Sequence, residues 1–214
     1  TTSQKAKISD SYLKEVIAEA KEKGYDPYSG NLKIYTNLDM DAQKKLYNIV
    51  NTDYYVAFPN DTMQVATTVV DPNNGKVIAQ IGGRKTGDVT YGLNRAVQTD
   101  RSSGSTAKPV MDYAPAIEYL DWATYHALKD TKFYYPGTST QLYDFDNRYK
   151  GTITMRQALI ESRNVPAIRA LQAVGMTKAK SFLSNLGYDT KGLSLQNGIG
   201  LPASTLQNAA AYAA

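Results

Sequence analysis

The hydrophobic pattern of the first 55 residues changes its period twice. Apolar residues three and four apart follow Ser9–Asp10, which can cap a helix, and Gly24 ends this pattern. Over Leu32–Leu38, apolar and polar residues alternate as in a strand. A second helical pattern follows Asp39, another good cap, and runs to about Val50. We therefore expect residues 1–55 to form a small α+β linker region.

A β-hairpin is the clearest pattern in the rest of the chain, residues 56–214. Two apolar, β-branched runs, Gln64–Val70 and Lys76–Ile81, flank Asp71–Gly75. The Pro, Asn and Gly of that connection favour a tight turn. These two runs are predicted to be neighbouring antiparallel strands.

Helical signals dominate after the hairpin. Pro109 is tolerated only in the first turn of a helix, so a helix that includes it must begin near Ser105.

Residues 120–151 look irregular and aromatic. Helices are then expected to begin at Thr154, Pro166, Thr177 and Ser204, and the last of them has no stop signal before the chain ends. The pattern thus places strands early and helices late.

The amino-acid composition excludes several kinds of catalytic and metal-binding site. The 214 residues contain no cysteine and one histidine, so thiol nucleophiles, disulfides, Cys-rich zinc sites and multi-histidine metal sites are excluded. A Ser-His-Asp triad could use only His126, for which a loop position is the simpler interpretation. The net charge of +4 is spread without a basic block, which argues against nucleic acid as a partner. No apolar run approaches the roughly 20 residues that span a bilayer.

Ser105 and Lys108 form a histidine-free candidate for nucleophilic catalysis. Three residues apart on a helix, their side chains share a face. A desolvated lysine has a lowered pKa and can take the proton that makes a serine hydroxyl nucleophilic. The pattern is short, and Ser11 with Lys14 matches it too, within an ordinary amphipathic helix where Lys14 is expected to be solvated.

Two further short motifs carry polar groups suited to a site. Ser162 and Asn164 lie between two predicted helices, where a hydroxyl can relay a proton and an amide can hold a peptide group. Ser29–Asn31 matches the same pattern, and its residue types are typical of a turn. Lys85–Gly87, the sequence Lys-Thr-Gly, is either an anion-binding strand end or an exposed turn.

Together these motifs resemble the transpeptidase domain of penicillin-binding proteins, whose marks are Ser-x-x-Lys, Ser-x-Asn and Lys-Thr-Gly. Six longer sequence segments are more specific than these short motifs, and they resemble the bifunctional class A members of the family, most of all the streptococcal ones. They are Asn37–Gln43, Ala79–Arg84, Gly104–Pro109, Tyr113–Glu118, Ser162–Ala167 and Ala209–Ala214.

The resemblance implies a role for each matching residue. Ser105 would be the acylated nucleophile, with its backbone N–H as half of the oxyanion hole, and Lys108 the general base. Ser162 would shuttle a proton, and Asn164 would hold the amide of the donor peptide. The third motif of the family follows Ser-x-Asn, whereas Lys85–Gly87 precedes Ser105. The functional Lys-Thr-Gly strand is therefore expected beyond Ala214.

The implied fold is α+β, the penicillin-binding and β-lactamase-like transpeptidase fold. It has an antiparallel sheet with helices and an all-helical lobe, of which residues 56–214 would be the N-terminal portion. Because such a chain would leave a strand edge open, we expect the C-terminal remainder of the same protein to complete it as a second polypeptide.

The implied activity is D-Ala-D-Ala transpeptidation of peptidoglycan stem peptides, without any cofactor or metal. β-Lactam antibiotics would acylate the same serine. The parent protein would carry an upstream glycosyltransferase domain and a membrane anchor, and would act on the extracellular face of the cytoplasmic membrane, while this fragment would be soluble. Two alternatives stay open: a carboxypeptidase or β-lactamase of the same fold, and a non-catalytic module that binds cell wall or protein.

One residue departs from the family pattern. Relatives often carry a bulkier apolar residue where this chain has Ala107, directly before the motif lysine. A lost side-chain volume can leave a cavity under the nucleophile, so we expect acylation by β-lactams to be altered and slower.

Overall fold

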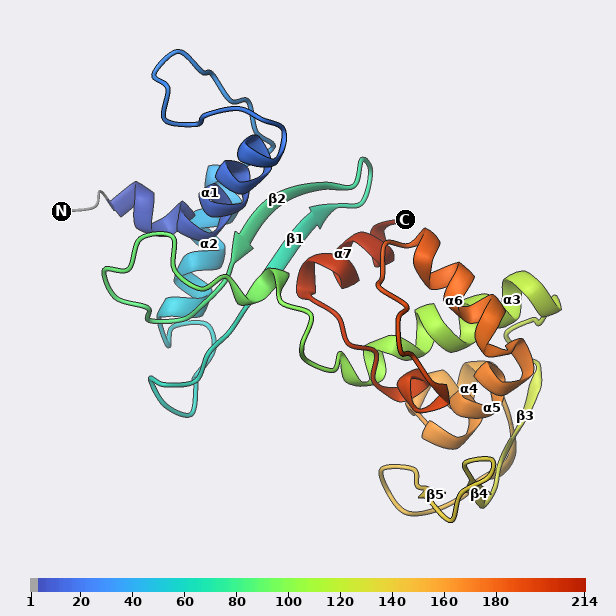
Figure 1. Ribbon diagram of the computed structural model, residues 1–214. Coiled ribbons are helices and arrows are strands. Elements are labelled where there is room, and N and C mark those ends of the chain that lie inside the picture. The colour runs from blue at the N-terminus through green and yellow to red at the C-terminus, as the bar shows by residue number, and fades with distance from the viewer. Residues whose placement is uncertain (1–3) are drawn as a thin grey trace. The chain divides into compact units, whose positions relative to one another are not determined.

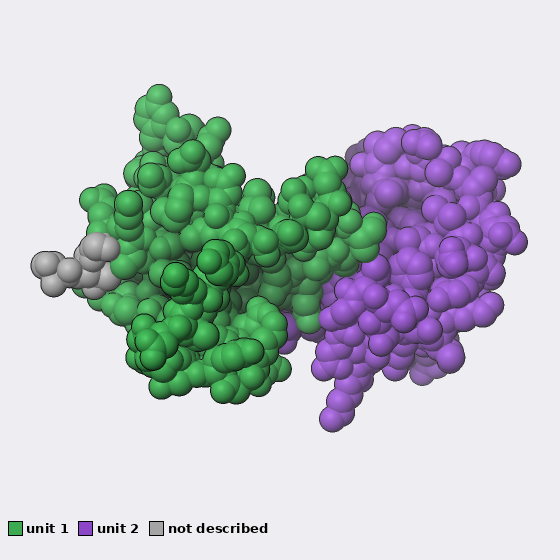
Figure 2. All heavy atoms as spheres, turned by 90° about the horizontal axis from the view of Figure 1, so that it is seen from above, with its two compact units in different colours: residues 1–98, 204–214 green, residues 99–203 purple. Residues whose placement is uncertain are grey.

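A computed structural model describes residues 4–214. The chain divides into two compact units, which Figure 2 distinguishes by colour. Unit 1 comprises residues 4–98 and 204–214, and unit 2 comprises residues 99–203. Within the described residues, no helix combines the length and the apolar character needed to cross a membrane. The expected boundary near residue 55 lies inside unit 1 and stays a prediction.

Unit 1 is built on the hairpin. Its helices and strands (Figure 1) are α1 (Gln4–Glu22), α2 (Met40–Asn51), β1 (Thr67–Asp71), β2 (Lys76–Ile81), the 3₁₀ turn η1 (Arg95–Val97) and α7 (Thr205–Ala213). β1 and β2 pair antiparallel from Thr67 opposite Ile81 to Asp71 opposite Lys76, as the sequence predicts. α1 and α2 pack against β2, while α7 packs against β1.

The helices of unit 1 confirm one predicted start and correct another. The side chain of Asp39 accepts hydrogen bonds from the amides of Asp41 and Ala42 and caps α2 as expected. The predicted cap at Ser9–Asp10 is wrong, because α1 already includes Gln4 and runs through both residues. The carboxylate of Asp10 instead accepts the backbone N–H of Tyr91 at 2.8 Å.

The predicted strand over residues 32–38 is also wrong. The segment is irregular and joins no ladder in the part of the chain that the structure describes. An alternating pattern makes a strand only where a partner strand lies alongside, and here the hydrogen bond from Asp39 N to Ile78 O, 2.9 Å, comes one residue after the segment.

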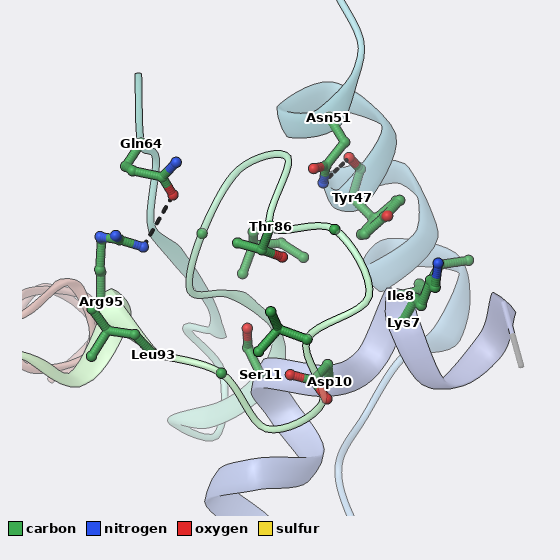
Figure 3. A pocket seen from close by; sticks show the side chains of 15 residues that line it. Lys7, Ile8, Asp10, Ser11, Tyr47, Asn51, Gln64, Thr86, Leu93 and Arg95 are labelled. Carbon is green, nitrogen blue, oxygen red and sulfur yellow. Dashed lines mark hydrogen bonds between the residues drawn. The ribbon is translucent and has the colours of Figure 1, made fainter. Parts of the chain in front are cut away.

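Polar side chains of α1 hold the loop that follows β2. Ser11 Oγ accepts the N–H of Gly82 at 2.9 Å, and Lys14 Nζ donates to the carbonyl of Gly92 at 2.6 Å. The loop borders an open pocket of about 270 Å³, which is lined also by α2, Gln64 and Arg95 (Figure 3). The sequence predicts a solvated Lys14, but its side chain is half-buried and hydrogen-bonded to this loop.

Unit 2 carries the helices that the second half of the sequence predicts, except the last one, α7, which belongs to unit 1. They are the 3₁₀ turn η2 (Gly104–Thr106), the π-helical segment η3 (Lys108–Tyr113), α3 (Ala114–Leu120), α4 (Met155–Ile160), α5 (Asn164–Val174), α6 (Met176–Asn185) and the 3₁₀ helix η4 (Leu195–Ile199). Thr154 caps α4 and Ser204 caps α7, both as predicted. Thr177 and Pro166 lie inside α6 and α5, whose starts therefore come slightly earlier than expected.

Residues 120–151 are more ordered than the sequence indicates. Two short antiparallel pairs form there: β3 (Ala127–Asp130) with β6 (Gly151–Thr154), and β4 (Phe133–Tyr134) with β5 (Gln141–Leu142). Strands of two to four residues are too short to show a period, so the pattern could not reveal them.

The core of unit 2 surrounds α5. Ile168 and Leu171 are fully buried, and so is Val165. One cluster joins α5 to β3, α4 and Tyr113, and a second joins it to β4, β5 and η4. Burial of this helix fixes its N-terminus, at which Ser162 and Asn164 lie.

Candidate functional site

Ser105 lies in the 3₁₀ turn that opens the helical run η2–η3–α3. The residues before it are anchored, because Ser103 N donates to Leu201 O at 2.8 Å and Ser102 bridges to Pro202. Gly104 adopts a φ of +57°, a conformation that favours glycine. The Ser105 side chain is exposed. The sequence thus placed Ser105 correctly at the start of a helix that contains Pro109.

Lys108 is fully buried two residues after this turn, and its ammonium group has three acceptors. Nζ donates to Ser162 O at 2.6 Å, to Ser162 Oγ at 3.0 Å and to Asn164 Oδ1 at 2.8 Å. A protonated lysine has three N–H donors, and all three are used here. Among the described residues Ser105 is not a partner of Nζ, so the geometry matches the protonated form of Lys108.

Burial lowers the pKa of Lys108 to about 8, and the carboxylates of Asp112 and Asp144 oppose that effect. Asp112, one turn further along η3, is itself fully buried, and burial raises the pKa of its carboxyl well above the usual range. Neither oxygen of Asp112 has a hydrogen-bond partner within residues 4–214. A lysine with a pKa near 8 is neutral in an appreciable fraction at physiological pH and can act as a base.

Ser162 meets Lys108 through an unusual backbone conformation. Its φ of +50° lies in the left-handed region, which costs a non-glycine residue about 1–2 kcal/mol. This conformation lets both the carbonyl and the hydroxyl of Ser162 accept from the same ammonium group. Strain of this kind is typical of functional sites.

Asn164 is held by both ends of its side-chain amide. Oδ1 accepts from Lys108, and Nδ2 donates to the carbonyl of Tyr143 at 2.8 Å. Asn164 is also the first residue of α5, and its backbone N–H donates to Asp144 Oδ1 at 2.7 Å.

Arg163, between the two motif residues, is fully buried among carboxylates. It donates to Asp130 at 2.9 Å, to Asp146 at 2.9 Å and to Asp144 at 3.3 Å. Burial and the neighbouring Asp144 raise the pKa of Asp130 to about 6, against the opposing effect of Arg163. This cluster comes from residues 130–146, which the sequence pattern marks as irregular. No local pattern could reveal it, because its members are distant in the sequence.

The structure brings Lys108, Ser162 and Asn164 into direct contact, whereas Ser105 lies on the preceding 3₁₀ turn and is not bonded to Lys108 Nζ. The competing matches to the two short motifs both lie in unit 1. Ser11 and Lys14 hold the loop after β2, and Ser29–Asn31 is an exposed turn.

Lys85–Gly87 is likewise a loop, in which Lys85 pairs with Asp61 and Gly87 has a φ of +68°. His126 is a half-buried loop residue, as expected, and its ring stacks on Trp122 with the centroids 3.7 Å apart.

Comparison with known proteins gives a consistent result. Residues 65–214 match the family profile described as the penicillin binding protein transpeptidase domain. The chain is 47% identical to penicillin-binding protein 1A of Streptococcus pneumoniae, over 96% of this chain and 30% of the relative. It is 42% identical to penicillin-binding protein 1A/1B of Bacillus subtilis, over 82% of this chain and 19% of the relative. The chain thus spans about a third of the length of the curated streptococcal relatives it matches.

Solved structures show the same fold. The crystal structure of penicillin-binding protein 1A from Haemophilus influenzae has a TM-score of 0.61 at 30% identity, over 70% of this chain and 23% of that one. A Mycobacterium tuberculosis protein solved in complex with penicillin V has a TM-score of 0.74 at 22% identity, over 95% and 58%. The resemblance of the sequence motifs and the implied fold are confirmed. The chain belongs to the penicillin-binding protein transpeptidase family.

Proposed function

We propose that this chain provides the nucleophile and base of a serine-type peptidoglycan DD-transpeptidase that β-lactams also acylate. The observation that carries the proposal is the buried Lys108 ammonium, which binds Ser162 and Asn164 and lies three residues after the exposed Ser105. Family membership supports the reaction class and, through the motif match, the choice of Ser105. The contacts of Lys108 with Ser162 and Asn164 support the proposal that these three residues act together.

In the acylation step, Ser105 Oγ attacks the carbonyl carbon between the two D-Ala residues of a stem peptide. Neutral Lys108 takes the hydroxyl proton and becomes the ammonium whose three acceptors surround it. The peptide C–N bond breaks, and the terminal D-Ala leaves as an amine after it receives a proton through Ser162. An acceptor amine then attacks the ester, forms the cross-link and returns Ser105 to its hydroxyl form.

Asn164 would hold the donor peptide. Its amide is oriented by Lys108 and Tyr143, so its position is fixed before a substrate arrives. Preorganised polar groups of this kind stabilise a transition state without a reorganisation cost. A β-lactam carbonyl would occupy the place of the scissile peptide, and the mycobacterial protein of the same fold, which binds penicillin V, supports this part of the proposal.

The partners proposed for the parent protein are an upstream glycosyltransferase domain, a membrane anchor and the C-terminal remainder with its Lys-Thr-Gly strand. The alternatives are a carboxypeptidase or β-lactamase of the same fold and a non-catalytic module that binds cell wall or protein. The family profile and the relatives, all penicillin-binding proteins, favour the transpeptidase.

Labelling with a fluorescent penicillin tests the proposal. The full-length protein, its Ser105→Ala variant and its Ser11→Ala variant are incubated with the reagent and separated by denaturing electrophoresis. We expect label on the wild type and on Ser11→Ala and none on Ser105→Ala, with slow release of label in a chase. Rapid release would favour a β-lactamase, and an unlabelled wild type would favour the binding module.

A further inference from the structure

Asp144 is a buried carboxylate outside the three family motifs, in the segment between β5 and β6. Its Oδ1 atom accepts two backbone N–H groups at the start of α5, from Asn164 at 2.7 Å and from Val165 at 3.1 Å. The first N–H groups of a helix have no partner within the helix. The residue that precedes α5, Arg163, provides no side-chain cap, so Asp144 supplies the acceptor from 20 positions away.

Tyr143, the residue before Asp144, binds the side chain of Asn164. The carbonyl of Tyr143 accepts from Asn164 Nδ2 at 2.8 Å, which leaves Oδ1 facing Lys108. Two consecutive residues therefore fix the backbone and the side chain of Asn164. A shift in the Tyr143–Asp144 segment would move the amide that contacts Lys108.

Asp144 also contributes negative charge near Lys108. Its other oxygen accepts from Arg163 Nη2 at 3.3 Å, and Asp130 and Asp146 share the same guanidinium. A fourth carboxylate near this guanidinium, Glu161, pairs with Lys150, so Arg163 alone faces these three carboxylates and the cluster keeps negative charge. Of these three carboxylates, Asp144 is the one that raises the pKa of Lys108, together with Asp112 on η3.

We propose that Asp144 is a positioning residue for the acylation reaction: it caps α5 and so fixes Asn164 against Lys108, and its carboxylate places negative charge next to that contact. This inference rests on the proposed function, because acylation of Ser105 is the step in which the effect is measured. It adds a residue that no motif contains.

The test compares three variants of the full-length protein by the pH dependence of the acylation rate constant with a fluorescent penicillin. Asp144→Asn keeps an oxygen for the two N–H groups but removes the charge. Asp144→Ala removes both. Asp146→Asn is the matched control, since it removes a charge that pairs with Arg163 at 2.9 Å but contacts neither Asn164 nor Val165.

The rate of the wild type rises as Lys108 loses its proton, and this rise is the acid limb of the profile. Without the charge of Asp144 the pKa of Lys108 falls, so we expect the limb of Asp144→Asn to move to lower pH. Asp144→Ala should show the same shift with a plateau about tenfold or more below that of the wild type, because Asn164 is displaced. The acid limb of the Asp146→Asn profile should lie at the same pH as that of the wild type.

Two results would overturn the role of Asp144. One is a limb that Asp144→Asn leaves unmoved, and the other is an equal shift in Asp146→Asn, which would make the effect a general property of the Arg163 cluster. Asp144→Asn decides the question even where Asp144→Ala does not fold. A wild type that takes up no label refutes the proposed function instead, so the two failures are distinguishable.

Discussion

The pH dependence of acylation follows from the burial of Lys108. Burial lowers the pKa of this lysine to about 8, and only the neutral amine can take the proton of Ser105. At pH 7 about a tenth of Lys108 is neutral, and at pH 9 about nine tenths. The second-order rate constant for acylation should therefore rise about tenfold from pH 7 to pH 9 and level off above that.

The assay measures the rate constant from gel fluorescence after timed reaction with a fluorescent penicillin, at constant ionic strength from pH 6 to pH 10. Ser105→Ala reports any labelling that does not involve the nucleophile, and circular dichroism at each pH checks that the protein stays folded. A rate constant that is flat over this range would refute the assignment of Lys108 as the base. A rate constant that still rises steeply between pH 9 and pH 10 would refute its lowered pKa.

Three further predictions concern single side chains. Ser162→Ala and Ser162→Gly both lose the hydroxyl that accepts from Lys108, so both should acylate more slowly than the wild type. Glycine relieves the strain at a φ of +50°, so Ser162→Gly should be more stable than Ser162→Ala by about 1 kcal/mol in urea unfolding. Equal stability of the two variants would contradict the strain. Gly198→Ala should lower the free energy of unfolding by about 1–3 kcal/mol, because the new Cβ would lie 2.7 Å from Asp112 Oδ1; an unchanged urea midpoint would argue against this contact. Ala107→Met restores side-chain volume next to Lys108 and should therefore be acylated faster than the wild type. Identical rate constants for the two proteins would contradict the hypothesis that Ala107 slows acylation.

Local signals were enough to predict the elements that place Ser105 and Asn164. Pro109 restricted where a helix could begin, and Thr154 and Ser204 identified two further starts by their capping chemistry. The pairing of Lys108 with Ser105, expected from their spacing, stays a prediction, because the ammonium group of Lys108 binds Ser162 and Asn164 instead. The contacts of Lys108 with Ser162 and Asn164 could be expected only from the family resemblance, because these residues lie 54 and 56 positions further along the chain.

The supporting residues could not be predicted for the same reason. Asp144 caps a helix that begins 20 positions later, and β3 with β6 is too short for its period to be seen. Conversely, the alternation over residues 32–38 predicted a strand that does not form, since strand formation depends on a partner rather than on the pattern alone.

The site of acylation tests the central claim most directly. The full-length protein is treated with a β-lactam, digested with trypsin and analysed by mass spectrometry, so that the mass of the adduct identifies the modified residue. We predict a single stable adduct on Ser105, absent from Lys108→Ala at neutral pH within the same reaction time. An adduct on another serine, such as Ser11, or no adduct in a folded full-length protein, would contradict the account.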